Sequence, residues 1–410
     1  MEKKVKIKKA GCKPTKVRSK IKTPSPILEP GSLAGSHRHL SSSFSMFPTG
    51  DMTSTNLPTQ MEDQSLYFQD LPEACKLKVF SYLENVEKGK YSSVCKDWAF
   101  LMKSPRLWNH VSLSDFTLGC LCTHKCTSEC YKKYKSRVFH FIQYLCQIRP
   151  VLNSLEFKLD IYNPSDKYLP QIENFLRMSQ CRELNYAHLN WKETPNQPLW
   201  LEEDCLYRES DVIHRHRLRH RKFVWFFDFF TNIASNLRTL IMPFGWSETS
   251  VEHLKRLKNL HTLVLEKYFV FQGLNQALLD RVLGNLPSLK QLLLEVWTPS
   301  GAGLLFYTLS SPSLQYLDIS QSRGFYLSGL NMPALKRFCV ARHPWNGPVV
   351  ACDKISIPCL YGVLIQGTPH LEKINDHYLD VNWKDGIYVT LEEVFKAVCA
   401  CKLHKRGWAM

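Results

Sequence analysis

The 410-residue sequence has no apolar run approaching the roughly 18 residues that a membrane-spanning helix requires. Its most apolar stretch, residues 223–230, is short and is interrupted by Asp228. No apolar segment follows the basic N-terminus, so no secretory signal is visible. The 15 cysteines are odd in number and irregularly spaced, which fits reduced thiols better than a disulfide framework. We therefore expect a largely globular protein of the cytoplasm and/or nucleus, with no membrane partner.

Catalytic patterns are also missing. The sequence has no Gly-x-Gly-x-x-Gly, no Walker phosphate loop, no Gly-x-Ser-x-Gly and no His-Glu-x-x-His. Its 15 histidines show no spacing tied to a serine or cysteine nucleophile. We therefore expect a non-catalytic protein without a cofactor.

The charge is uneven along the chain. The sequence carries 53 Lys+Arg against 37 Asp+Glu, and residues 1–40 alone hold nine Lys and two Arg against two Glu. Residues 1–65 are rich in Lys, Ser, Thr, Pro and Gly without apolar periodicity, which predicts a disordered basic tail. The run from Lys3 to Lys22 is typical of a nuclear-localisation or polyanion-binding segment, or of a solvated tail without a specific role.

Ordered structure is expected from about residue 66. Pro72 suits the first turn of a helix, and Leu77, Phe80 and Leu83 fall on one face of it. A second helix is predicted from about residue 90 to 102, followed by a short turn at residues 105–108. Three short helices cannot bury all of these apolar residues, so we expect this module of about 40 residues to pack against a partner.

Four blocks in this segment occur in a characteristic order, at residues 71–73, 79–83, 92–98 and 105–108. The segment resembles an F-box, which we place at residues 66–113. The resemblance implies docking to the Skp-type adaptor of cullin–RING ubiquitin ligases. The family's apolar contact and core positions fall on Leu71, Pro72, Phe80, Val94, Cys95, Trp98 and Trp108. Cys75, Lys76 and the pair Lys88-Gly89 replace residues that are usually apolar.

The pattern Leu-x-x-Leu-x-Leu recurs, with conservative substitutions, through the C-terminal part of the chain. Six copies begin 21 to 29 residues apart, at Leu237, Leu260, Leu289, Leu314, Leu335 and Leu360. Weaker copies begin at Leu152 and Cys181. Proline stands two residues before the last four strong copies, at Pro287, Pro312, Pro333 and Pro358. A single unit cannot bury its apolar face, so stacked units must share one core.

These units resemble leucine-rich repeats, although the usual Asn or Cys ladder is missing. The resemblance implies an α/β fold, in which the small helical F-box is followed by an irregular repeat solenoid with a parallel sheet on its concave face. We expect residues 114–150 to form a Cys-rich linker and first helix. The array would occupy residues 151–410, with an insertion at about 187–236 and an amphipathic C-terminal cap at 391–403.

Five potential zinc ligands lie close together in the linker: Cys120, Cys122, His124, Cys126 and Cys130. Zinc prefers four Cys or His ligands, but the usual Cys-x-x-Cys pairing and a second knuckle are absent. Neighbouring lysines could instead lower the thiol pKa values and raise reactivity, and a simple Cys-rich linker is a third interpretation. We do not favour a metal site.

A basic run at residues 214–222 directly precedes the aromatic run at 223–230. Nucleic-acid binding is an unfavoured interpretation, because the aromatics are contiguous rather than interleaved with the charges. We expect a helix with a solvated basic start and buried later turns, and contact with an acidic partner remains open.

Residues between the inward leucines should point to the opposite face of the sheet. The middle positions of the strands are mostly apolar: Ile241, Val264, Leu293, Asp318, Cys339 and Leu364. Aromatic residues that could anchor an interface follow the strands, at Trp246, Tyr268, Trp297 and Trp345. We predict a substrate-binding surface comprising Trp246, Val264, Tyr268, Leu293, Trp297 and Leu364. Alternatively, the insertion or the C-terminal tail covers this row.

The sequence thus favours a substrate-recognition subunit of an SCF-type ubiquitin ligase. Its F-box would hold the adaptor, and through it the cullin and the RING protein, while the repeats would bind an unknown protein substrate. The alternative is an adaptor-bound scaffold or regulator without substrate turnover.

Overall fold

The computed structural model describes residues 67–113, 128–158, 168–190, 210–269, 274–297, 306–322, 325–340 and 360–386. The predicted basic tail at residues 1–65 and the predicted cap at 391–403 lie outside these ranges. Within the described residues, no helix combines the length and apolar character needed to cross a membrane.

A helical module opens the described chain. Its elements are the 3₁₀ turn η1 (Phe68–Asp70), helices α1 (Glu73–Phe80), α2 (Asn85–Tyr91) and α3 (Lys96–Leu101), and the 3₁₀ turn η2 (Pro105–Trp108). The single helix predicted from about residue 90 to 102 is wrong, because residues 92–95 separate two helices. Cys95 has an extended backbone, and its Sγ accepts a hydrogen bond from Trp98 N at 3.5 Å, which caps α3.

A ten-stranded sheet follows, in which the strands lie side by side in the order in which they occur along the chain. The strands β7 and β9 are not part of it and form a separate two-stranded sheet. Its strands are β1 (His110–Ser112), β2 (Ser154–Lys158), β3 (Tyr186–Asn190), β4 (Thr239–Pro243), β5 (Thr262–Phe269), β6 (Gln291–Trp297), β8 (Tyr316–Asp318), β10 (Arg337–Cys339), β11 (Lys373–Ile374) and β12 (His377–Tyr378). All neighbours pair in parallel except β11 and β12. The expected parallel sheet is therefore confirmed.

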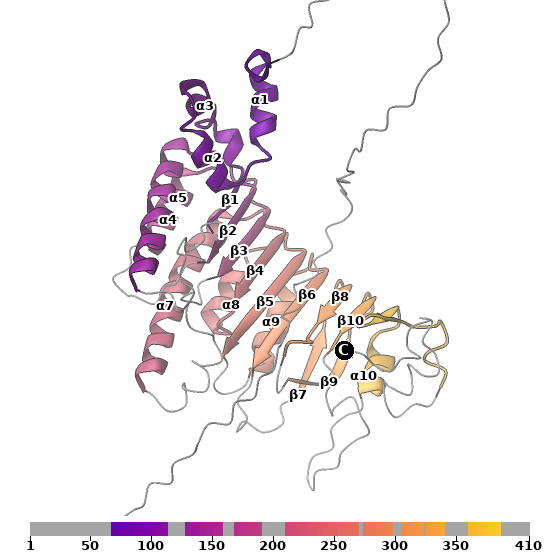
Figure 1. The fold of residues 1–410 in the computed structure, drawn as a ribbon. Coiled ribbons are helices and arrows are strands. Elements are labelled where there is room, and N and C mark those ends of the chain that lie inside the picture. Colours follow the sequence, from indigo (N-terminus) through magenta and orange to yellow (C-terminus); the bar gives the residue numbers. More distant parts are fainter. Residues whose placement is uncertain are drawn as a thin grey trace, which may run out of the picture. The chain divides into compact units, whose positions relative to one another are not determined.

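One buried side chain from each of the nine parallel strands, β1 to β11, lies in register across this sheet. The row consists of Val111, Leu155, Ala187, Leu240, Leu263, Leu292, Leu317, Phe338 and Ile374. Helices α4 (Ser128–Ile148), α5 (Tyr168–Met178), α7 (Ser210–Ile233), α8 (Glu248–Leu254) and α9 (Gln276–Asn285) lie along one face of the sheet (Figure 1). Aromatic contacts join the two layers, as between Phe157 of β2 and Phe226 of α7 at 5.8 Å. The leucine pattern thus supplies the core between sheet and helices.

The sixth copy of the pattern does not form a strand. Residues 360–367 form helix α10 (Leu360–Gly367), which packs on β9 (Tyr326–Asn331) of a second, two-stranded sheet with β7 (Phe306–Ser310). The strand prediction fails there because apolar residues spaced by three and four also suit a buried helix. The next strand is β11, and Pro369 stands two residues before Leu371, at the same offset as the earlier prolines.

Two further expectations about the array need correction. The weak copy at Cys181 is displaced by three residues, since Ala187 and Leu189 are the buried strand positions and Tyr186 is only half-buried. The expected insertion at about 187–236 includes residues 187–190 of β3 and residues 210–233 of α7. These parts belong to the sheet and its helical layer because their apolar side chains complete the core.

Candidate functional site

Large apolar side chains are exposed mainly on the N-terminal module. Among the described residues, six of the ten exposed large hydrophobic residues lie there: Tyr67, Val79, Tyr82, Tyr91, Val94 and Phe100. Tyr82 is 76% exposed, Phe100 70% and Val94 60%. We call these six residues the module surface. Exposed apolar side chains gathered in one small region are typical of a protein-binding site.

The module surface is supported by an aromatic cluster. The rings of Phe68, Phe80 and Trp98 lie within 5.1–5.5 Å of one another, and Tyr91 is 6.1 Å from Trp98. Phe80 is buried and Trp98 is half-buried. Such edge-on aromatic contacts hold α1 and α3 in fixed positions.

Trp108 connects the module to the sheet. It is fully buried, its Nε1 donates to Met102 O at 2.8 Å, and its ring lies 5.5 Å from Phe141 and 5.6 Å from Tyr144 of α4. The Tyr144 hydroxyl donates to the same carbonyl at 3.2 Å. Because β1 also pairs with β2, the module and the array share one core.

A buried lysine replaces one of the apolar residues expected in this module. Lys88 is 4% exposed, its Nζ donates to Leu107 O at 2.7 Å, and Nζ lies 5.3 Å from the centre of the Trp108 ring. The carbonyl and the aromatic face compensate for the loss of water around the ammonium group. This departure from the usual pattern is therefore accommodated inside the module.

The seven residues predicted to contact an adaptor divide into two groups. Leu71, Pro72, Val94 and Cys95 are exposed or half-buried, so they are available to a partner. Phe80, Trp98 and Trp108 belong to the core beneath. Sequence reasoning did not select Tyr67, Val79, Tyr82, Tyr91 or Phe100. Val79 and Tyr82 lie off the helical face formed by Leu77 and Phe80. This position was the sequence signal that could have identified them as exposed.

Comparison with known proteins gives this module its family. An F-box-like model matches residues 68–114. This segment is an F-box-like domain. One curated protein, F-box/LRR-repeat protein 12 from Bos taurus, is 39% identical over 51 residues. That match covers 12% of this chain and 16% of the relative, so the chain spans about a sixth of the relative's length.

The predicted middle row of the sheet is continuous across five strands. Ile241, Val264, Leu293, Asp318 and Cys339 lie in register. Leu293 is half-buried, whereas Ile241 and Val264 are 7% and 8% exposed. Leu364 does not belong to this row, because it is fully buried in α10.

Of the four predicted anchoring aromatics, Trp345 lies outside the described residues, and the other three do not stand together beyond the strands. Trp246 is 7% exposed, and its ring packs 5.1 Å from that of Phe244, so it contributes to the core. Tyr268 and Trp297 lie inside β5 and β6, since both strands extend further than predicted. A register shift between Leu265 and Tyr268 accompanies this extension. The structure describes the backbone but not the side chains of Tyr268 and Trp297.

A histidine between two carboxylates extends the middle row toward the F-box-like domain. His188 Nδ1 lies 3.4 Å from Glu156 Oε1, and His188 Nε2 lies 3.4 Å from Glu266 Oε1. The Nε2 contact is electrostatic, because it lacks hydrogen-bond geometry. Burial alone would lower the pKa of His188, but the two carboxylates outweigh it and raise the pKa to about 9. Sequence reasoning missed this group because it depends on strand register.

The cysteine-rich segment lies mostly outside the described residues. Cys120, Cys122, His124 and Cys126 are not described, and Cys130 lies in α4 without a described side chain. The zinc hypothesis therefore remains untested. In the part of the chain that the structure describes, no three His, Cys, Asp or Glu side chains are placed to hold a metal ion.

Proposed function

We propose that this chain is a subunit of an SCF-type ubiquitin ligase and that its F-box-like domain docks a Skp-type adaptor. The adaptor would connect the chain to a cullin and a RING protein. The proposal is carried by one observation: the F-box-like domain exposes the module surface although Phe80 and Trp108 are packed inside it. Burying a side chain such as Val94 or Phe100 against a partner contributes roughly 1.5–3 kcal/mol, which an isolated domain forgoes.

The geometry of the domain supports docking of a preformed surface. The aromatic cluster below the module surface and the contacts of Trp108 with α4 fix the helices before any partner arrives. Preorganisation of this kind reduces the conformational entropy lost on binding. We therefore expect the adaptor to bind without large rearrangement of α1 and α3.

We further propose that the array receives a protein substrate and that the chain itself is non-catalytic. The support is the middle row, in which the half-buried Leu293 adjoins Val264 on the face away from the helices. The alternative is a scaffold or regulator without substrate turnover. The two functions differ in one observable, because only loss of a substrate receptor raises the abundance of a bound partner.

Substitution of a single exposed valine tests adaptor docking. Val94→Asp places a charge in the module surface, so it should reduce binding to a purified Skp-type adaptor at least roughly tenfold. Val381→Asp is a matched control, because Val381 is 96% exposed and lies far along the chain from the domain. Surface plasmon resonance with full-length proteins gives the two affinities.

Both variants should keep the wild-type thermal transition, since neither side chain is buried. Adaptor binding by Val94→Asp at wild-type affinity would refute docking through this surface. Equal weakening by Val381→Asp would also refute it, because the effect would then be one of charge alone.

A further inference from the structure

Helix α7 exposes one aromatic side chain from a run that is otherwise largely buried. Phe223, Phe226, Phe227 and Phe230 are at most 2% exposed, whereas Trp225 is 75% exposed. The helical period explains the division, since Phe226 packs on Phe157 of β2 and Phe227 packs on His253 of α8, whereas Trp225 lies off these faces of the helix. None of the helices and strands in the described ranges buries Trp225, and tryptophan is enriched among residues that dominate binding energy.

Basic side chains lie on both sides of Trp225 along the helix. The exposed Arg221 is one turn earlier on α7. One turn later on α7 is the half-buried Phe229. The guanidinium group of Arg177 in α5 lies over its ring, with the guanidinium carbon 4.3 Å from the ring centre. From Arg221 to Phe229 is eight residues, or about 12 Å of helix. Glu173 partly balances Arg177, since Arg177 lowers the carboxyl pKa that burial raises. Arg221 is therefore the principal cation.

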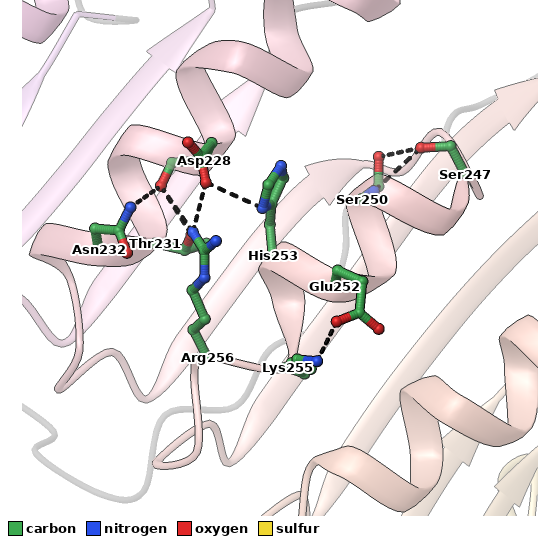
Figure 2. Close-up of polar contacts among 9 residues, drawn as sticks. All are labelled: Asp228, Thr231, Asn232, Ser247, Ser250, Glu252, His253, Lys255 and Arg256. Atoms are coloured by element: carbon green, nitrogen blue, oxygen red, sulfur yellow. Dashed lines mark hydrogen bonds and ion pairs between the residues drawn. The ribbon is translucent and has the colours of Figure 1, made fainter.

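The acidic residue nearest to Trp225 on α7 is already engaged. Asp228 Oδ1 accepts a hydrogen bond from Arg256 Nη1 at 2.6 Å and lies 3.2 Å from His253 Nδ1. Figure 2 shows Asp228 directed toward these two residues, with Thr231 also bonded to Arg256. Asp228 is thus committed to the junction between α7 and α8. In the part of the chain that the structure describes, no ion pair involves Arg221, so its guanidinium is available for an external carboxylate.

We propose that Arg221, Trp225, Phe229 and Arg177 form a docking site for an acidic amphipathic segment of a protein partner. An apolar side chain of that segment packs on Trp225 and Phe229, and its carboxylates pair with the arginines. The two arginines select an acidic partner, because their guanidinium groups pair with carboxylates. The roughly 12 Å axial spacing of the site matches about two helical turns of the partner segment. This site is separate from the module surface and goes beyond adaptor binding.

The same residues fit single-stranded nucleic acid poorly. Proteins that bind single strands offer several aromatic faces on which successive bases stack. Here the other aromatics of the run are buried, which leaves Trp225 and the half-buried Phe229. A protein segment with one apolar anchor can pack on these two aromatic side chains alone.

A labelled peptide tests the proposal with the full-length protein. The probe is a fluorescein-labelled helical peptide of about 15 residues with two glutamates seven positions apart and a leucine between them. Its matched control carries glutamine in place of both glutamates. Arg221→Glu and Trp225→Ala should each weaken binding of the acidic peptide roughly tenfold in fluorescence anisotropy at physiological salt. Arg182→Glu, the same charge change at an exposed position outside α7, should weaken it less than twofold.

Several results would overturn the proposal. These are absence of binding by the acidic peptide, equal binding of the glutamine peptide, or equal weakening by Arg182→Glu. Tighter binding of a single-stranded RNA oligonucleotide that Trp225→Ala abolishes would assign the site to nucleic acid instead. Self-association of the chain that is lost in Trp225→Ala would assign it to a second copy. Each variant should retain wild-type adaptor affinity, so failure of this site is distinguishable from failure of the adaptor proposal.

Discussion

His188 shows how a single residue can couple strands that are not neighbours. Glu156 lies on the adjacent strand β2, whereas Glu266 lies on β5, beyond β4. Because each ring nitrogen faces a carboxylate, the doubly protonated imidazolium suits the site best. His188 therefore acts as a fixed positive charge that links three strands of the sheet.

The raised pKa of His188 makes its contribution to stability depend on pH. The unfolded pKa is about 6.5 and the folded pKa is about 9, so the contribution is complete below about pH 6.5 and is lost as the pH rises through 9. His188→Gln should lower the free energy of unfolding by up to about 3 kcal/mol at pH 6.5. The difference from wild type should shrink above pH 9.

Urea unfolding of both proteins at pH 6.5, 8 and 9.5 measures this dependence. Glu266→Gln is the companion variant, because it removes one of the two carboxylates and should reduce the same pH effect. A stability difference that stays constant from pH 6.5 to 9.5 would show that His188 contributes packing rather than charge.

At the residue scale, the sequence could identify the F-box-like motif but could not separate its contacts from its core. Phe80, Trp108 and Val94 all match family positions, yet the first two are buried and the third is exposed. Both kinds of residue are apolar, so the motif looks the same in sequence. The packing of Phe80 in the aromatic cluster and of Trp108 against α4 distinguishes the core residues from the exposed ones.

At the level of elements, five of the six strong copies of the leucine pattern form strands and the sixth forms a helix. Pro287, Pro312 and Pro333 precede strands of the main sheet, as does the unrecognised Pro369. Pro358 precedes α10 instead. A short apolar run satisfies both the strand period and the helix period, so the choice is made by packing on β9 rather than by local pattern.

Two glycines of α10 provide a test of that packing. A Cβ at Gly367 would overlap the backbone oxygen of Leu330 in β9, whereas a Cβ at Gly362 would meet nothing. Gly367→Ala should therefore lower the free energy of unfolding by roughly 1–3 kcal/mol. Gly362→Ala should be neutral or raise it by up to about 1 kcal/mol, because alanine favours a helix interior.

Thermal unfolding of the two alanine variants gives the comparison, and each serves as the control for the other. Equal stability of Gly367→Ala and Gly362→Ala would show that α10 does not approach β9 as closely as described. The helix would then be free to take a different position at this end of the array.

At the scale of the whole molecule, the F-box-like domain is built into the array. Trp108 packs on α4, β1 pairs with β2, and one hydrophobic cluster runs from Phe80 to Trp383. The sequence indicated a helical module followed by a parallel sheet, and both are present. It could not indicate that the two share a core, since β1 is only three residues long and carries no leucine pattern.

A shared core has a consequence for the proposed ligase subunit. A partner bound to the sheet and an adaptor bound to the domain would be held by one continuous folded unit. Their separation would be set by packing rather than by a linker. Such rigidity suits a receptor that must present a substrate at a defined distance from the adaptor.

Isothermal titration calorimetry of the full-length chain with a purified Skp-type adaptor tests the central claim most directly. The account predicts one-to-one binding with a negative heat-capacity change, because the module surface is apolar and becomes buried in the complex. The Val94→Asp protein should give weaker binding and a smaller heat-capacity change. If wild-type protein gives no binding heat at several temperatures, or binds with a heat-capacity change near zero, docking through the module surface is contradicted.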